Sequence, residues 1–318
     1  MHHIALLGAG FSHNWGGWLA SEAFEYLLGT HEVLADPGLR ELLWRYEGAG
    51  GFEAALAELQ LEHDQPGVPV PLPIRAQLDA FQSAVGSMFR DMNDAIKRQV
   101  EFSTTNYQSA GALLARFDAI FSLNQDLLLE RLYVRTLEGT GGRWKGAVLP
   151  GMRSISNANT AEFSFWSDGN WQPRSRAEFV TEPDLQPIYK LHGSSNWVSA
   201  RDEKMLVIGG EKSRAIASHE VLAWYSEEFE RWLSTGVRLM VIGYGFRDDH
   251  INHALLRAAD KGLQLFVVDP RGAESAGDDK DLQDLFKRTL IGASRRSIVE
   301  TLRSSTAECS KVTRFFEN

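Results

Sequence analysis

The chain has almost no cysteine. Cys309 is the only one among 318 residues, which excludes an internal disulfide and a zinc site built from four thiolates. Structural disulfides form in oxidising compartments, and a single cysteine cannot form one within the chain. We therefore expect the protein to act in the reducing setting of the cytoplasm.

Long apolar runs are also absent. No apolar segment approaches the roughly 20 residues that a membrane-spanning helix needs. The short apolar run near the start leads straight into a glycine turn, without the cleavage-site pattern of a signal peptide. We expect neither a membrane span nor a signal peptide.

An excess of positive charge is the third feature that the chain lacks. Its formal net charge is −9, so the overall charge gives no electrostatic footprint for binding nucleic acid directly. The hydrophobic content of 43% is ample for one large domain with an insertion, or for two domains.

Five short apolar runs indicate buried strands. They begin at Ile4, Phe117, Pro187, Arg238 and Leu263. Near-continuous apolar runs without polar alternation are typical of parallel strands that helices cover on both faces. The sequence therefore predicts an α/β fold, with a Rossmann-like parallel sheet, helices on both faces and a helical insertion after the first strand-helix unit.

The insertion is indicated by a long amphipathic pattern. Apolar residues recur every three or four positions from Ile74 to Val100, after the extended connector PGVPVPLP. We expect this helix to pack on its own domain, with a subunit interface as the alternative. The predicted domains are a core of residues 1–36 and 112–275, a helical insertion of residues 37–111 and a C-terminal helical segment of residues 276–318.

The region from Gly139 to Pro187 is rich in glycine, serine, asparagine and tryptophan. Tryptophans are costly to leave in a free linker, so ordered loops or short hairpins are expected there. The segments SNWVSA and KMLVIGG that follow are predicted to pair as a hairpin. From Asp281 onward we expect one or two helices.

Small or polar clusters follow the first four predicted strands, with the sequences GAGFS, NQD, HGSS and GYGF. Ligands of open α/β sheets bind outside the carboxyl ends of the strands. We therefore expect the four clusters to converge in space.

The first cluster, at residues 8–12, allows the backbone to approach a pyrophosphate closely. A helix predicted from near Gly16 to Leu28 would add N–H donors. His13 stands where a dinucleotide fingerprint has its third glycine, so a plain tight turn is an equal alternative.

The next two clusters carry polar side chains. Asn124 and Asp126 stand on alternate residues and can both face the crevice, although Asp126 is also a good helix N-cap. His192 directly follows a strand and can act as a general base near neutral pH. Its alternative is a simple hydrogen bond within the turn.

The fourth cluster and the strand after it complete the candidates. Gly243 and Gly245 bracket Tyr244 and permit close approach of the backbone to a ligand, and Asp248 or Asp249 caps the next helix. His250 and His253 have i, i+3 spacing, but with no third ligand identified we expect no metal. Asp269 either accepts hydrogen bonds from ribose hydroxyls or is a turn residue.

In their order along the chain, these motifs resemble the sirtuin superfamily of NAD-consuming proteins. The resemblance rests on GAGFS, LNQD and KLHG, with a glycine turn after a later strand. It implies NAD⁺ as substrate, with Asn124 and Asp126 positioning the nicotinamide ribose and the attacking group, and with His192 as the base. The implied nucleotide-binding residues are Gly8, Ala9, Gly10, Phe11 and Ser12 for the diphosphate loop, and Gly243, Tyr244 and Asp269 on the adenosine side.

Two departures from the deacylating sirtuins indicate a subclass. The two Cys-x-x-Cys pairs of their zinc module are absent, and HNWGGWLA stands where their glycine loop continues into G-I-P-x-F-R. The chain is in this respect similar to the sirtuin-like domains of bacterial anti-phage defence systems, which hydrolyse NAD⁺ to nicotinamide and ADP-ribose.

That likeness implies an NAD⁺ glycohydrolase that is activated by assembly or by a partner. The implied partners are further copies of the chain in a homo-oligomer, and a HerA-like ATPase or a short Argonaute. Two alternatives are open: a non-catalytic subunit that senses NAD or ADP-ribose, and a deacylase that lacks the zinc module.

Overall fold

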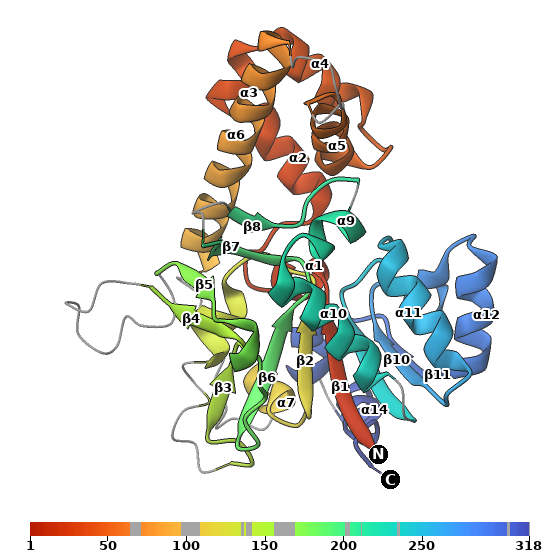
Figure 1. The fold of residues 1–318 in the computed structure, drawn as a ribbon. Helices are drawn as coiled ribbons and strands as arrows, with labels where there is room; N and C mark the ends of the chain where they lie inside the picture. The colour runs from red at the N-terminus through yellow and green to blue at the C-terminus, as the bar shows by residue number, and fades with distance from the viewer. Residues whose placement is uncertain are drawn as a thin grey trace.

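A computed structural model describes residues 1–63, 71–96, 109–134, 137, 142–155, 169–200, 204–210, 212–233, 236–303 and 306–317. A seven-stranded sheet with the order β11-β10-β9-β1-β2-β6-β3 forms its centre (Figure 1). All neighbouring strands in it run parallel. The strand bounds are β1 His2–Leu7, β2 Ala119–Ser122, β3 Gly146–Val148, β6 Leu185–Lys190, β9 Val237–Ile242, β10 Gln264–Val268 and β11 Leu290–Ser294.

All five strands predicted from apolar runs are confirmed, and they are the five adjacent strands from β10 to β6. Residues 4–7 of β1 are fully buried, as expected for a central parallel strand. The two edge strands were missed. β3 has only three residues, and β11 is largely half-exposed, so neither produces an apolar run.

Helices cover both faces of the sheet, which confirms the predicted fold class (Figure 1). Their bounds are α7 Ala110–Leu114, α9 Lys212–Ala217, α10 Glu220–Trp232, α11 Asp249–Ala259, α12 Lys280–Thr289, α13 Ile298–Arg303 and α14 Thr306–Arg314, with a π-helix η1 at Leu129–Val134 and 3-10 turns η3 at Arg176–Glu178 and η4 at Gly272–Ala276. The expectation of one or two C-terminal helices was wrong, because β11 and two further helices follow α12.

Short helices and one long helix lie between β1 and β2. Their bounds are α1 Ala9–His13, α2 Ala20–Leu28, α3 His31–Ala35, α4 Pro37–Arg45, α5 Gly51–His63 and α6 Leu72–Ile96. Helices α2 to α6 stand as a group beyond the carboxyl edge of the sheet (Figure 1). The division of the chain into three domains at the predicted boundaries stays a prediction.

Helix α6 confirms the predicted amphipathic helix within the described residues. Leu78, Phe81 and Val85 on its apolar face are buried, and the helix packs on α2, α3 and α5. It therefore packs on its own chain, as expected. Residues 97–100 of the predicted helix and residues 66–70 of the connector lie outside the described residues.

The helix predicted from near Gly16 to Leu28 was wrong at its start. The chain turns into α1 directly after Gly8 and begins α2 only at Ala20. Gly16, with φ of +87°, and Gly17, whose amide donates to Ser12 O at 3.0 Å, form the turn between them. The positive φ interrupts the helix.

A second, four-stranded sheet has the order β4-β5-β7-β8. Its strands are β4 Met152–Ser154, β5 Trp171–Pro173, β7 Gly193–Val198 and β8 Lys204–Leu206. Strands β7 and β8 pair antiparallel, which confirms the predicted hairpin. In the tryptophan-rich region, β4 and β5 also pair antiparallel, and Trp171 is buried, as expected for an ordered hairpin.

None of the helices within the described ranges is long and apolar enough to cross a membrane.

Candidate functional site

The carboxyl ends of the central strands meet at one edge of the sheet, as predicted. The turn after β1 packs directly on the turn after β9. The amide of Gly8 donates to Ile242 O at 3.0 Å, and that of Gly10 to Gly243 O at 2.9 Å. A Cβ on Gly243, whose φ is +65°, would come within 2.3 Å of the Phe11 amide nitrogen. The glycines are thus required by contact between the two turns.

Asn124 joins the loop after β2 to the glycine turn. Its Nδ2 donates to Gly8 O at 2.8 Å and to Ser12 Oγ at 2.9 Å. Both amide hydrogens are therefore used, and no residue in the described ranges donates to its Oδ1. The side chain is half-buried, so this oxygen is left to accept a hydrogen bond from water or a ligand.

Asp126 takes the role of a cap. Its Oδ1 accepts a hydrogen bond from the Leu128 amide at 2.9 Å, which is the capping alternative that the sequence left open. Its carbonyl accepts from the buried ammonium of Lys190, which also bonds Glu130 Oε1 and Ser194 Oγ, each at 2.7 Å. Through its bond to the Asp126 carbonyl, the buried Lys190 holds the backbone of this loop in place. A direct role of Asp126 toward ribose stays a prediction.

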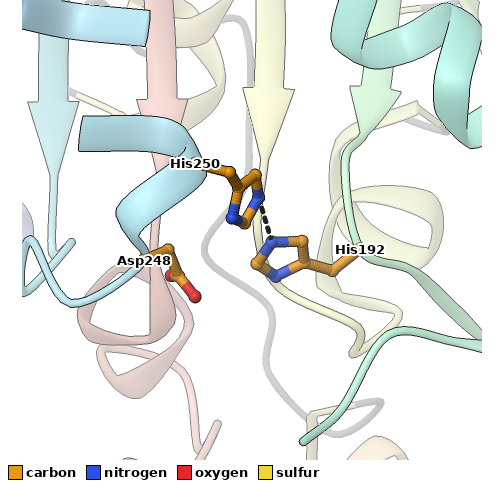
Figure 2. Close-up of side chains that lie close together, drawn as sticks. All are labelled: His192, Asp248 and His250. Carbon is orange, nitrogen blue, oxygen red and sulfur yellow. Dashed lines mark hydrogen bonds between the residues drawn. The ribbon is translucent and has the colours of Figure 1, made fainter. Parts of the chain in front are cut away.

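His192 lies two residues beyond β6 and is 3% exposed. Its Nε2 is 3.1 Å from Nε2 of His250 on α11, and the two rings turn these nitrogens toward each other (Figure 2). Burial lowers the pKa of His192 to about 3 and also lowers the pKa of His250. Both imidazoles are therefore neutral near pH 7, and one donates the shared hydrogen bond to the other.

Asp248 stands beside the two histidines at the start of α11 (Figure 2). Its Oδ1 accepts from Lys212 Nζ at 2.5 Å, and Lys212 also pairs with Glu53 of α5 at 2.8 Å. Burial acts to raise the pKa of Asp248, but the neighbouring imidazole of His192 and the ammonium of Lys212 outweigh it and hold that pKa below its ordinary value. Lys212 thereby links the helical group to the sheet edge.

The loop after β9 is braced from α11. Tyr244 is buried, and its hydroxyl donates to Asn252 Oδ1 at 3.1 Å and accepts from the Asp248 amide at 3.0 Å. Asn252 Nδ2 donates to Phe246 O at 2.9 Å, which holds Phe246 at a φ of +56°. Tyr244 is thus occupied in holding the loop, and its contact with a nucleotide stays a prediction.

Asp269 is engaged locally at the end of β10. Its Oδ1 accepts from the Arg271 amide and from Ser275 Oγ, each at 2.9 Å. These are the contacts of a turn residue, the alternative that the sequence left open. Its proposed bond to a ribose stays a prediction.

Two cavities of about 540 and 480 Å³ lie elsewhere, one between η4 and α12 and one near the amino end of β1. Neither is lined by a predicted site residue. The predicted site residues lie instead in the polar cluster at the sheet edge, whose side chains converge from four strand ends.

Sequence reasoning missed several of the residues that assemble this edge. No motif in the sequence pointed to Lys212, and Asp248 was predicted only as a helix N-cap. His250 was noticed for its spacing to His253, but His253 is exposed and the real neighbour of His250 is His192. Asn93 of α6 was also missed, although its Oδ1 accepts from the Leu127 amide at 2.9 Å.

Chemically, the edge offers a neutral imidazole and an amide oxygen that can accept. The lone pair of the neutral His192 ring can accept a hydrogen bond or, against the burial that lowers its pKa, a proton, and Asn124 can orient a hydroxyl or a water molecule. The glycine turn beside them exposes Ala9. Such an arrangement suits a reaction that needs a base and an oriented nucleophile.

Comparison with known proteins identifies the family. No curated protein matches the chain. One similar solved structure is that of Sir2Tm bound to a propionylated peptide, with 14% identity, a TM-score of 0.39 and coverage of 95% of this chain and 90% of that chain. Another is a SIR2 in complex with an inhibitor, 2'-O-acetyl-ADP-ribose and a deacetylated p53 peptide, with 12% identity, a TM-score of 0.38 and coverage of 95% and 91%. A family model described as a SIR2-like domain matches residues 118–291. Because this match spans more than half of the chain, the protein belongs to the SIR2-like domain family.

Proposed function

We propose that this chain is an NAD⁺ glycohydrolase, which cleaves NAD⁺ to nicotinamide and ADP-ribose. Membership of the SIR2-like family supports NAD⁺ as the substrate. The observation that carries the proposal is that the imidazole of His192 and the side chain of Asn124, whose amide oxygen is left to accept, lie at the same carboxyl edge of the sheet.

The reaction needs little acid catalysis. The bond from the ribose to the nicotinamide nitrogen breaks with its electron pair going to the nicotinamide, which was cationic and leaves as a neutral molecule. Water forms the new bond to the same ribose carbon and loses a proton. A site for this step must orient the water, stabilise the developing positive charge on the sugar and accept the proton.

His192 and Asn124 divide these tasks. Where His192 donates through Nε2 to His250, its Nδ1 carries a lone pair, and this nitrogen lies on the side of the ring away from His250 (Figure 2). It therefore acts as the base toward water or a ribose hydroxyl. Asn124 Oδ1 accepts a hydrogen bond from the water and aims it at the sugar. Asp126 supports the loop, and residues 8–12, Gly243, Tyr244 and Asp269 flank the nucleotide.

The lack of thiolates for a zinc module supports hydrolysis over deacylation. With Cys309 as its only thiol, it cannot build the zinc module of the deacylating group that it resembles. In our proposal water takes the place of an acyl oxygen as nucleophile. A deacylase without that module, and a subunit that only senses NAD or ADP-ribose, are the rival functions.

The biological role that we propose is depletion of NAD⁺ in the cytoplasm during antiviral defence. Activity would be held back until a homo-oligomer or a complex with a HerA-like ATPase or a short Argonaute forms. The link through Lys212 from α5 to the site supports such control, because a partner that moves the helical group would also move Asp248.

One experiment separates these functions. The purified chain is incubated with NAD⁺, alone and with each candidate partner, and nicotinamide and ADP-ribose are followed by chromatography. We expect stoichiometric release of both products, abolished in His192→Ala. Tight NAD⁺ binding without product in every condition would overturn the hydrolase in favour of the sensor, and product only with an acylated peptide would favour the deacylase.

A further inference from the structure

We propose that His192, His250 and Asp248 form a binding site for one divalent transition-metal ion of the zinc type, and that the bound ion blocks NAD⁺ cleavage. The blocking half rests on the proposed function, whereas the binding half does not. Among the described residues, these three form the group whose ligand atoms come close enough to share an ion, all within 4.8 Å of one another.

The distance between the two histidines fits a shared ion. Zinc–nitrogen bonds of about 2.0–2.1 Å in a tetrahedral site place two imidazole nitrogens about 3.3 Å apart. The Nε2 atoms of His192 and His250 are 3.1 Å apart. They come from different elements, and their rings turn these nitrogens toward each other (Figure 2).

Asp248 completes a set of three. It stands two residues before His250, and its carboxylate points to the side of the two rings (Figure 2). A ligand oxygen of Asp248 lies within 4.8 Å of the ligand nitrogens of both histidines, so a change in its side-chain torsion angles can bring it to an ion held by both nitrogens. Two histidines and one carboxylate are the ligands of catalytic zinc sites that keep a position open for water or a ligand.

The donor set selects the class of metal. Two imidazole nitrogens disfavour Mg²⁺ and Ca²⁺, which take oxygen ligands, and the site has no thiolate to favour Cu⁺. Zn²⁺, Co²⁺ and Ni²⁺ suit a mixed nitrogen and oxygen site.

The local charge also favours a cation. Lys212 contributes one formal positive charge, and Asp248 and Glu53 contribute two formal negative charges. The cluster therefore carries a net charge of about −1 before the ion binds. Because Lys212 can keep its pair with Glu53, Asp248 can turn toward the ion without leaving the ammonium unpartnered.

Occupancy would disable His192 as a base. A neutral imidazole has one ring nitrogen with a lone pair and one with a hydrogen. An ion on Nε2 of His192 uses that lone pair and fixes the hydrogen on Nδ1, so Nδ1 can no longer accept a proton. Metal binding and proton uptake by this ring therefore exclude each other.

The binding half is tested on the full chain after chelator treatment and dialysis. Zn²⁺ is titrated by calorimetry, and Co²⁺ by the visible absorption that four-coordinate cobalt gives. We expect one ion per chain. Loss of an outer-shell partner alone costs about 10–100-fold in metal affinity, so His250→Gln and Asp248→Asn, which remove ligands, should each weaken binding by at least about 100-fold. His253→Ala, an exposed change on the same helix, is the matched control.

Folding of each variant is checked by its circular dichroism and melting curve. Asp248→Asn preserves the shape of the side chain, so the test does not depend on His250→Gln alone. Binding by the wild-type chain that is equally tight in both ligand variants would overturn the site, and so would the absence of any Zn²⁺ or Co²⁺ binding by the wild-type chain.

The blocking half is tested under the condition that activates NAD⁺ cleavage. We expect stoichiometric Zn²⁺ to lower turnover at least about tenfold, an equal concentration of Mg²⁺ to leave it unchanged, and a chelator to restore it. Full turnover with the ion bound would overturn this half. Failure to cleave NAD⁺ in every condition would overturn the proposed function and the blocking half together, while the cobalt spectrum would still decide the metal site.

Discussion

The amide nitrogen of Asn124 lies 2.9 Å from the hydroxyl oxygen of Ser12, although 112 positions separate the two residues. The same nitrogen donates to Gly8 O. The loop after β2 is thereby fixed to the glycine turn after β1, and the Asn124 side chain is held in one orientation before any substrate arrives. Such preorganisation is what a site needs when it must aim a nucleophile.

Replacing Asn124 by alanine should lower kcat about 100–1000-fold, the usual effect of deleting one preorganised polar group at a reacting centre. NAD⁺ turnover, measured by nicotinamide release, checks this. Ser12→Ala should cost less, because Gly8 O still accepts from the amide. A retained activity above about one tenth in Asn124→Ala would contradict the proposed role.

Stability should fall at acid pH because of His192. Burial lowers its pKa to about 3 from 6.5, so between these values the unfolded chain binds a proton that the folded chain does not. The stability linked to this group is therefore fully present above pH 6.5 and is lost as the pH falls toward 3. His250 and Asp248, whose pKa values are also lowered, act in the same direction.

Urea unfolding at a series of pH values from about 8 to about 4 checks this slope. The wild-type chain should lose more stability over that range than His192→Gln, which cannot gain the charge. Parallel curves for the two proteins would show that His192 titrates normally in the folded chain.

Substituting Gly243 should separate the two glycine turns. A Cβ there would meet both a positive φ and the backbone of Gly10 and Phe11, the nearest atom at 2.3 Å. Gly48→Ala is the matched control, because Gly48 also has a positive φ, +74°, but open space around its Cβ position. The control should cost about 1–2 kcal/mol, and Gly243→Ala clearly more. Equal unfolding free energies would refute the close contact of the turns.

The predictability of this fold depended on where each strand lies. The central strands are buried on both faces, so Ile4 and its neighbours form an apolar run that can be recognised in the sequence alone. The edge strands β3 and β11 lack this pattern. Helix α1 was missed because GAG suggests a loop, whereas the chain is already helical from Ala9.

The site was predictable only in part, for a similar reason. The rule that ligands gather at strand ends located Asn124 and His192. The contacts of Lys212, Asp248 and His250 depend on how β6, α9 and α11 pack, and no local pattern encodes this. Local hydrogen bonding determines the roles of Asp126 and Asp269, because each caps the turn that follows it.

Removing the ammonium of Lys212 should destabilise the folded chain. Lys212→Met keeps the length of the side chain but leaves Asp248, whose side chain is 12% exposed, without its partner. We expect a loss of about 1–3 kcal/mol, below the range for a fully buried pair. Glu53→Gln removes the more exposed partner and should cost less. Urea unfolding measures the loss of unfolding free energy in both variants. A loss in Glu53→Gln as large as that in Lys212→Met would contradict the prediction.

Asn93 should couple the helical group to the site. It is buried in α6, where its Oδ1 accepts from the Leu127 amide and its Nδ2 donates to Ser195 Oγ, each at 2.9 Å. These contacts reach the loop of Asn124 and the hairpin that follows His192. Asn93→Ala leaves the Leu127 amide without an acceptor, so it should lower the unfolding free energy by about 1–3 kcal/mol and also lower kcat.

Ser195→Ala removes only one of these two contacts and serves as the matched control. It should lower stability by less, because the Leu127 amide keeps its acceptor. Urea unfolding and nicotinamide release are measured on both variants. If Asn93→Ala loses stability while kcat stays at the wild-type value, α6 only supports the fold; if both fall together, the contacts of Asn93 transmit the position of the helical group to the reacting centre.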